Sequence, residues 1–406
     1  MRLLLLTQYF PPEMGAPQVR LSELGERLID RGWQVEALTA LPNYPTGRIF
    51  ENYAHWRPCR ELIGRIDTVR VPLLPARTGF IKRLLSYFSF VFAACWYGPR
   101  MCARPDIMLV ESPPLFIGYA ARYLAWRWGC PYTFNVSDLW PESAIRMGIL
   151  RPGFATRMAE RLELSLYKQA SAVTGQSEEI IAAVRKRVPE TPNEVITNGV
   201  APNRFGKSKA NPSITRIMGD EPGPIFIYAG LFGLAQGLDQ LLDIAASWPA
   251  DVPGRFVLVG DGPARELIQN RIRDQGLTRV RVLPAQPRED IPALLAASDV
   301  AFISLGMSIP GAVPSKIYEA MASSLPIVLI ADGEPARRVN RAGCGLVVAP
   351  GKADEAREAC LRLARDPALR EQLGAAGRRA AEQDYNRETI AQRLDLFLAR
   401  VVANPK

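Results

Sequence analysis

The sequence has 406 residues, a formal net charge of +9, 48% hydrophobic residues and 22% charged residues. This length exceeds one ordinary hydrophobic core and predicts two domains, while the composition excludes a disordered chain. The single histidine, His55, excludes a histidine-rich metal centre. The six cysteines form no CxxC pair, so we expect reduced thiols in a cytoplasmic protein.

The basic surplus is concentrated in residues 55–104, which contain nine lysine and arginine residues, Arg77 among them, and two acidic residues. A local excess of this kind indicates an anionic partner. Nucleic acid is one candidate, but the sequence contains no helix-turn-helix, zinc-finger or RNP pattern. We therefore expect that the anionic partner of this segment is not a nucleic acid.

The first half alternates predicted strands with helices. Residues 1–7 read as a short buried strand, because the apolar run is shorter than the core of a signal peptide. Leu21, Leu24 and Leu28 then form one stripe of a helix. Further strands are predicted at residues 34–39, 68–74, 106–110, 132–136 and 194–197. Strands that alternate with helices imply a parallel sheet with right-handed crossovers.

Within this half, residues 80–101 form an apolar, aromatic segment flanked by Lys82, Arg83 and Arg100. Its uncharged run is shorter than the roughly 20 residues that cross a membrane. The segment is therefore either a buried packing helix or a helix that lies in the membrane plane, with basic flanks on anionic lipid. We favour the second alternative.

The second half repeats the α/β pattern after a linker, residues 202–224, that is rich in proline, glycine and polar residues. Strands are predicted at residues 225–229, 255–259, 281–283, 300–304, 326–330 and 346–348. Helices are predicted at residues 237–247, 263–275 and 387–402. The sequence thus predicts a domain over residues 1–201, a second domain over residues 225–385, and a final helical segment over residues 386–406.

Ligands of open α/β sheets bind beyond the carboxyl ends of the strands, so the turns that follow the strands are candidate sites. One such turn contains Gly15 and another contains Gly230, Gly233 and Gly237, where bare backbone can approach a phosphate. The turn at Gly15 is equally readable as an ordinary turn. The three glycines of the second turn suit a diphosphate, but their spacing is not the GxGxxG of a dinucleotide fingerprint. The turn at residues 260–263 is more typical of structure than of binding.

The densest signal is the segment 310–322. We expect Ser315 to be the N-cap of a helix, which places Lys316 and Glu319 in its first turn. A lysine in the first turn is unfavourable beside the positive end of the helix dipole unless an anion offsets its charge. A nearby carboxylate can accept hydrogen bonds from sugar hydroxyls. A solvated Lys–Glu pair is the alternative. In the first half, Asp138 follows a strand and is an acid, a base, a binder of acceptor hydroxyls or a helix cap.

Seven stretches of the sequence together resemble the bacterial family-4 glycosyltransferases of the GT-B fold over essentially the whole length. The similarity is greatest to the surface-polysaccharide subgroup that includes colanic-acid and L-N-acetylfucosamine transferases. The stretches are QYFPPEMGAPQVRLSEL, LPNYPTG, SDLWPES, ITNGV, YAGLFGLAQGLDQLL, VGDGP and PSKIYEAMA. The resemblance implies two Rossmann-like doubly wound α/β domains facing a cleft, with the C-terminal helix crossing back to the N-terminal domain.

The resemblance further implies transfer of a sugar, with retention of anomeric configuration, from a nucleotide-diphosphate donor without metal or other cofactor. In this reading Lys316 and Asp138 are catalytic, and Glu319 grips the ribose. The remaining donor-binding residues are Gly15, Gly230, Gly233, Gln286 and Ser315. We expect a UDP-linked N-acetylated amino or deoxy-amino sugar, because the subgroup uses such donors.

The implied acceptor is a polyprenyl-diphosphate-linked saccharide in O-antigen, capsule or exopolysaccharide assembly. We expect Asn43, Tyr44, Lys82 and Arg83 to contact the acceptor or the membrane. The protein would then be a peripheral protein at the cytoplasmic face of the inner membrane.

Four positions depart from the common family pattern. Leu231 and Gln236 stand where an arginine and a lysine are usual, Gly311 replaces the first glutamate of a Glu-x7-Glu motif, and Ser137 replaces a histidine. We interpret these changes as a transfer of phosphate binding to Lys316. Two alternatives remain: a non-catalytic nucleotide-sugar-binding scaffold protein, which the missing residues favour, and a nucleotide-sugar epimerase, which the motifs disfavour.

Overall fold

The structure is a computed structural model. It describes residues 1–76, 79–146, 148, 150–207, 212–219, 222–233, 236–307 and 309–404. Arg77 of the basic segment, part of the predicted linker (208–211 and 220–221) and part of the predicted glycine-rich turn (234–235) lie outside these residues. The chain divides into two compact units. The first comprises Met1–Asn198, Pro310–Ala312 and Glu388–Lys406, and the second comprises Gly199–Ile309 and Val313–Arg387.

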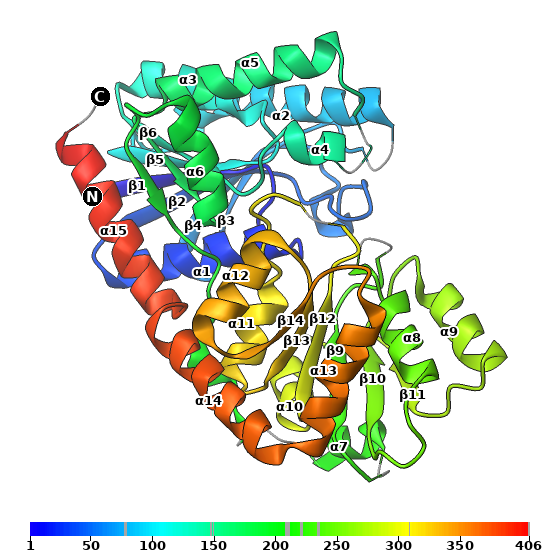
Figure 1. The fold of residues 1–406 in the computed structure, drawn as a ribbon. Coiled ribbons are helices and arrows are strands. Elements are labelled where there is room, and N and C mark those ends of the chain that lie inside the picture. Colours follow the sequence, from blue (N-terminus) through cyan, green and yellow to red (C-terminus); the bar gives the residue numbers. More distant parts are fainter. Residues whose placement is uncertain are drawn as a thin grey trace. The chain divides into compact units, whose positions relative to one another are not determined.

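The first unit is built on a sheet that has, in the described residues, eight strands in the order β3-β4-β2-β1-β5-β6-β7-β8 (Figure 1). Its strands are β1 Arg2–Leu6, β2 Gln34–Ala40, β3 Cys59–Ile63, β4 Ile66–Val71, β5 Ile107–Ser112, β6 Tyr132–Val136, β7 Ala172–Gly175 and β8 Asn193–Val195. All neighbours are parallel except β3 and β4. The direction of strand order reverses between β1 and β5, which is where such sheets bind ligands.

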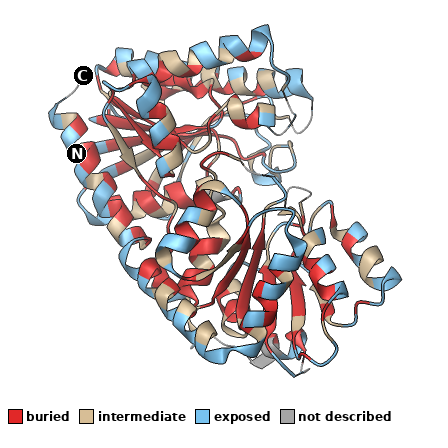
Figure 2. Ribbon diagram, viewed as in Figure 1, coloured by how far each residue is buried: buried red, intermediate tan, exposed pale blue. Residues whose placement is uncertain are grey.

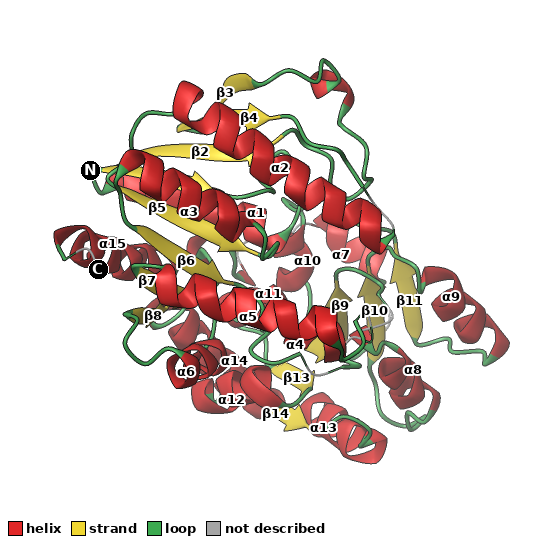
Figure 3. Ribbon diagram, turned by 90° about the horizontal axis from the view of Figure 1, so that it is seen from above, coloured by secondary structure: helices red, strands yellow, loops and turns green. Residues whose placement is uncertain are grey.

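Helices cover both faces of this sheet. They are α1 Ala16–Asp30, η1 Glu51–Tyr53, α2 Phe80–Met101, α3 Ile117–Trp128, α4 Glu142–Arg146, α5 Phe154–Gln169, α6 Glu178–Arg187 and α15 Arg387–Ala403. Helices α2, α3 and α5 lie side by side over one face (Figure 3), and α1 and α15 pack on the other. Ile390, Leu394 and Phe397 of α15 are buried in the same cluster as Leu24 of α1.

The second unit has, in the described residues, six parallel strands in the order β11-β10-β9-β12-β13-β14. The strands are β9 Ile225–Ala229, β10 Arg255–Val259, β11 Val280–Leu283, β12 Val300–Ser304, β13 Ile327–Ile330 and β14 Gly345–Val348. The helices are η2 Pro202–Arg204, α7 Pro212–Met218, α8 Asp239–Ala246, α9 Arg265–Asp274, α10 Ile291–Ala296, α11 Ser315–Ala322, α12 Gly333–Ala342, α13 Ala353–Arg365 and α14 Pro367–Gln383. Here the strand order reverses between β9 and β12.

These two doubly wound sheets confirm the predicted fold class. In Figure 2 the strands of both sheets are largely buried, as expected for parallel sheets covered on both faces. Two strands were absent from the sequence prediction: β3, the antiparallel edge strand, and β7. The residues expected as a linker include η2 and α7, both of which belong to the second unit.

Helix α2 has the predicted bounds and has both a buried and an exposed face. Phe90, Ala94 and Gly98 are buried, whereas Phe92 and Ile81 are 72% and 71% exposed. The two alternatives drawn from the sequence are thus not exclusive, because one face packs on the sheet and the other meets solvent. Within the described part of the chain, no helix combines the length and apolar character needed to cross a membrane.

Candidate functional site

The first candidate site lies where strand order reverses in the second unit. Strand β9 ends at Ala229, and Gly230 follows with a φ of 147°, in a region that L side chains rarely adopt. The N–H of Gly230 donates to the carbonyl of Val259 over 2.8 Å. A Cβ on Gly260 would lie 1.9 Å from the Gly230 carbonyl oxygen, so the turns after β9 and β10 are in direct backbone contact.

Helix α11 begins beside this turn. It starts at Ser315, and its N-cap is Pro314, so the prediction that Ser315 is the N-cap is wrong. Pro314 adopts the extended backbone (φ −60°, ψ 133°) that an N-cap requires and has no side-chain acceptor to offer. Lys316 is in the first turn as predicted, whereas Glu319 lies in the second.

The ammonium of Lys316 lies against Tyr228 and Gly230. Its Nζ donates to Tyr228 Oη over 2.5 Å and lies 3.8 Å from the centroid of that ring. A Cβ on Gly230 would lie 2.3 Å from Lys316 Cε and 2.6 Å from Nζ, so a side chain there would displace the lysine ammonium. Burial lowers the pKa of Lys316 to about 8, against the opposing effect of the Glu319 charge. Because burial disfavours the charged form of Lys316, an anionic ligand beside the ammonium would stabilise that form.

Glu319 is half-buried on the same helix. Burial raises the pKa of its carboxyl, and the charges of four cations oppose that shift. The four are Arg288, Arg387, Lys316 and Arg204. Three of them, with Glu319, line a small cavity of about 30 Å³, large enough for a single water molecule.

Gln286 lies just after β11, at the same edge of the sheet as Gly230, and its Nε2 donates to the carbonyl of Pro284 over 3.1 Å. Gly233 is under less constraint, because an added Cβ would meet only ordinary contacts at 3.6 Å and beyond. The geometry thus brings Gly230 and Lys316 into contact and leaves Gly233 without a steric need for glycine.

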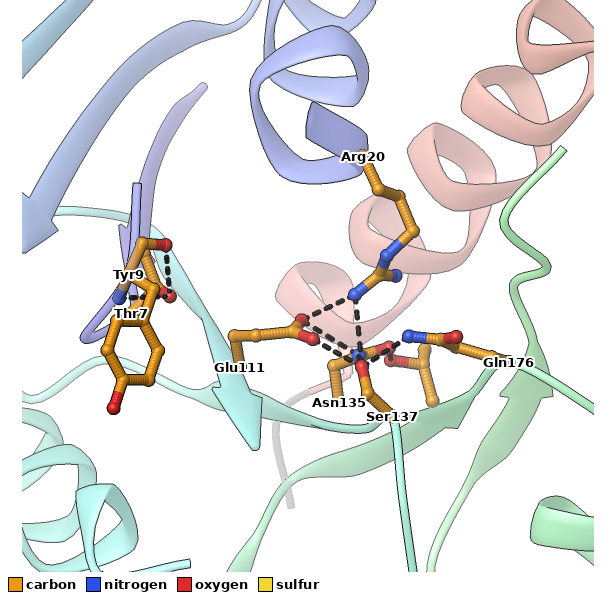
Figure 4. Close-up of polar contacts among 8 residues, drawn as sticks. Thr7, Tyr9, Arg20, Glu111, Asn135, Ser137 and Gln176 are labelled. Carbon is orange, nitrogen blue, oxygen red and sulfur yellow. Dashed lines mark hydrogen bonds and ion pairs between the residues drawn. The ribbon is translucent and has the colours of Figure 1, made fainter. Parts of the chain in front are cut away.

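The second candidate site lies at the carboxyl ends of β5, β6 and β7 in the first unit (Figure 4). Arg20 of α1 and Glu111 of β5 form an ion pair over 2.6 Å, with side chains 2% and 3% exposed. Asn135 Nδ2 also donates to Glu111, over 2.8 Å. Neither Arg20 nor Glu111 was singled out from the sequence, although Arg20 lies within the stretch PQVRLSEL and Glu111 nearly ends a strand.

Ser137 is the centre of this cluster. Its hydroxyl donates to Glu111, and it accepts from Arg20 over 3.3 Å, from Asn135 over 3.1 Å and from Gln176. Ser137 is therefore held in place by four side chains. We refer to Arg20, Glu111, Asn135, Ser137 and Gln176 as the Arg20 cluster.

Asp138 follows this cluster in the chain and is half-buried. Its Oδ1 accepts from the hydroxyl of Ser143, and it also accepts from the N–H of Leu139. Burial raises the pKa of Asp138 against these two hydrogen bonds. Asp138 binds a side chain of α4 rather than the backbone N–H groups of that helix, which argues against a cap.

Two other residues predicted in the first unit, Asn43 and Tyr44, meet at Glu13. The Glu13 carboxylate accepts from the N–H groups of Asn43 and Tyr44 over 2.8 Å each, which joins the turn after β1 to the stretch LPNYPTG. Asn43 is only 4% exposed, whereas Tyr44 is 46% exposed. Gly15 is the N-cap of α1 with extended backbone, and a Cβ there would lie 2.3 Å from Gln18 Oε1.

Lys82 and Arg83 are exposed near the start of α2. Arg83 donates to Tyr87 Oη over 3.0 Å, and Lys82 lines a hollow of about 1310 Å³. Across the described residues, no group of three or more histidine, cysteine, aspartate and glutamate side chains is placed to bind a metal ion.

Gly311, where the family has a glutamate, has a φ of 72°. A Cβ there would lie 2.5 Å from Ile180 Cγ1 and 2.7 Å from Ser177 Oγ. This backbone and this crowding disfavour a longer side chain at this position.

Comparison with protein families covers most of the chain. Residues 15–199 match the family model described as "Glycosyl transferase 4-like domain", and residues 215–380 match the one described as "Glycosyl transferases group 1". Among curated proteins, the chain is 27% identical to the protein named as colanic acid biosynthesis glycosyl transferase WcaI of Escherichia coli K12, over 82% of this chain and 84% of that protein. It is 24% identical to the glycosyltransferase WbjE of Pseudomonas aeruginosa, over 65% and 68% of the two chains.

Solved structures show the same fold at low identity. Sucrose-phosphate synthase from Thermosynechococcus elongatus superposes with a TM-score of 0.77 at 20% identity, over 99% of each chain. HepE of Anabaena, in complex with UDP and glucose, gives a TM-score of 0.72 at 18% identity, over 98% of this chain and 99% of that one.

Proposed function

Since the chain belongs to the family-4 glycosyltransferases of the GT-B fold, we propose that it transfers a sugar from a nucleoside-diphosphate donor to a polyprenyl-diphosphate-linked saccharide. The main support for donor binding is the contact of Lys316 with Gly230, at the strand-order reversal of the second unit. Parallel α/β sheets bind nucleotides at this point. A lysine whose charge is disfavoured by burial is suited to bind a diphosphate there.

In this proposal the donor diphosphate lies between the Gly230 turn and the N-terminus of α11. As the bond to the sugar breaks, negative charge grows on the leaving diphosphate, and Lys316 with the helix N–H groups stabilises it. These fixed charges take the place of a metal ion. The acceptor hydroxyl attacks from the face that the diphosphate leaves, so the anomeric configuration is retained.

The Arg20 cluster and Asp138 are assigned to the reacting sugar and acceptor. Ser137 and Asp138 follow β6 at the ligand-binding edge of the first sheet. Burial raises the pKa of Asp138, as expected for a carboxyl that exchanges a proton with an acceptor hydroxyl.

Two similarities support the choice of donor and pathway. HepE was solved with UDP and glucose, and WcaI is described as a transferase of colanic acid biosynthesis. We therefore propose a UDP-linked N-acetylated amino or deoxy-amino sugar and a role in surface polysaccharide assembly.

The exposed face of α2 supports a membrane-bound acceptor. Phe80, Ile81, Leu85 and Phe88 are 58%, 71%, 55% and 42% exposed, next to Lys82 and Arg83. Large apolar side chains grouped on one surface mark an interaction site, and basic neighbours favour anionic lipid. We propose that this face contacts the cytoplasmic surface of the inner membrane.

A thermal-shift panel of UDP, GDP, CDP and ADP tests the donor half. A ligand that binds only the folded state at 100 times its Kd stabilises by about 2.7 kcal/mol, which raises Tm measurably. We expect UDP alone to raise Tm in the wild type and Lys316→Met to lose most of that shift. Equal shifts for all four nucleotides, or a full UDP shift in the variant, would contradict the assignment.

A further inference from the structure

The hollow beside Lys82 and an apolar groove along α2 are lined by successive parts of the same three chain segments. Residues 46–53 line the hollow and Trp56 lines the groove; Pro75 and Ala76 line the hollow and residues 72–74 line the groove. Helix α2 contributes Lys82 to the first and Phe92 and Trp96 to the second. The two depressions therefore lie along the same segments and differ in polarity.

The hollow is the more polar of the two, with apolar and polar side chains both in its lining. Arg48 and Lys82 line it and are both exposed, and Glu51 is the one acidic residue in its described lining. Its volume, about 1310 Å³, exceeds that of a typical small-molecule pocket. It is large enough for a saccharide together with a phosphate group near the two cations.

The groove, of about 420 Å³, is the apolar part. Its rim consists of Trp56, Leu74, Phe92 and Trp96, whose side chains are 48%, 56%, 72% and 52% exposed. The rings of Phe92 and Trp96 stack at 6.5 Å with 11° between their planes, and the N–H of Leu74 donates to Ser89 Oγ of α2 over 2.8 Å. The first contact orders the α2 wall of the groove, and the second ties that wall to the segment that contains Leu74.

We propose that this groove binds the isoprenoid chain of a diphosphate-linked acceptor, with the diphosphate at Arg48 and Lys82 and the saccharide in the hollow. From Lys82 to Phe92 the helix rises about 15 Å, so one amphipathic ligand reaches both parts. This inference rests on the proposed function and adds to it the recognition of the lipid. A flat surface would suffice for membrane contact alone, whereas an apolar groove and a basic hollow that follow one another along α2 match one molecule that has a polar head and an apolar chain.

Calorimetric titration with farnesyl diphosphate, isopentenyl diphosphate and inorganic pyrophosphate tests this inference without any sugar transfer. We expect wild type to bind farnesyl diphosphate at least ~10-fold more tightly than isopentenyl diphosphate, because only the longer chain fills the groove. Phe92→Ser should lose that preference. Lys82→Gln should weaken the binding of all three ligands. Binding of farnesol, which lacks the diphosphate, should be the same in this variant as in wild type.

The matched control is Trp126→Ser on α3, whose side chain is 77% exposed and lies outside the groove lining. It should keep the wild-type preference for chain length, and Tm of both variants checks folding. Affinity that does not depend on chain length, equal losses in both serine variants, or full competition by dihexanoyl phosphatidylglycerol would overturn the proposal. Chain-length preference without any sugar transfer would instead overturn only the proposed function.

Discussion

At Gly230 the backbone and the Lys316 side chain compete for one volume, which gives the most local prediction. In Gly230→Ala the new Cβ would collide with Lys316 Cε and Nζ, at 2.3 and 2.6 Å, and the φ of 147° would be strained. We expect donor affinity to fall at least ~10-fold, as for the loss of one charged contact, in equilibrium binding of the nucleotide.

Gly343→Ala is the control that introduces backbone strain without a steric clash. Gly343 caps α12 with a φ of 58°, and an added Cβ would have nothing within 4 Å. This variant should lower Tm by the strain alone and leave donor affinity unchanged. If both alanine variants weaken the donor equally, the contact with Lys316 does not matter.

Lys316 also predicts the pH dependence of donor binding. Its pKa in the free protein is lowered to about 8, and a bound diphosphate favours the protonated form and raises it again. Between these two pKa values, Lys316 takes up a proton when the diphosphate binds. Below pH 8 Lys316 is already charged, so its titration should not change the affinity. Above that pH, affinity should fall by up to about tenfold per pH unit.

Lys316→Arg isolates this effect, since a guanidinium stays charged over the whole range while the ligand titrates as before. Nucleotide affinity measured from pH 6.5 to 9.5 should lose its decline above pH 8 in the variant. The same decline in both proteins would show that Lys316 does not titrate on binding.

Among the elements, those with a strong sequence period were predictable and those without were not. β7 was missed because Ala172–Gly175 is four small or β-branched residues, all buried, with no alternation to read. β3 was missed because it is an edge strand that packs little into the core, with alternate residues exposed. The start of α11 shifted by one residue because Pro314, rather than Ser315, adopts the N-cap backbone.

The Arg20 cluster links α1, β5 and β6 and predicts an asymmetric mutational response. Removing one partner of a buried ion pair leaves a charge without compensation and costs about 3–5 kcal/mol, whereas replacing both with apolar residues costs far less. In urea denaturation, Glu111→Leu should therefore be much less stable than the double variant Arg20→Met/Glu111→Leu.

The double variant should still transfer sugar poorly, because Ser137 would lose two of the four side chains that hold it. Recovery of both stability and transfer in the double variant would show that the Arg20–Glu111 pair has only a structural role. Equal stability of the single and double variants would contradict the ion-pair argument itself.

For the whole molecule, the two-domain α/β fold followed from the alternation of strands and helices along the sequence. The Arg20 cluster did not, because Arg20 and Glu111 are 91 residues apart and only the folded sheet brings them together. The position of Gly230 against Lys316 was likewise hidden, although each residue was singled out separately.

The uneven charge of the molecule predicts salt-sensitive membrane binding. Lys82 and Arg83 stand beside exposed apolar residues of α2, and attraction to anionic lipid is screened as ionic strength rises. In flotation with phosphatidylglycerol vesicles, binding should fall between about 0.05 and 0.5 M salt. The double variant Lys82→Gln/Arg83→Gln should bind several-fold more weakly than wild type at low salt.

Arg273→Gln/Lys352→Gln, which removes two exposed charges from the second unit, should bind vesicles as wild type does. Equal losses in the two double variants would show that only net charge matters.

The central claim is that Lys316 supports metal-free transfer of a sugar to a lipid-linked acceptor. The most direct measurement follows label from UDP-N-acetylhexosamines into a polyprenyl-diphosphate-linked saccharide, in the presence of EDTA. Wild type and Lys352→Met should transfer label equally, and Lys316→Met should be slower by at least ~100-fold, the scale for loss of one group that stabilises the transition state. Transfer that requires a divalent metal, or near-normal transfer by Lys316→Met, would contradict the account.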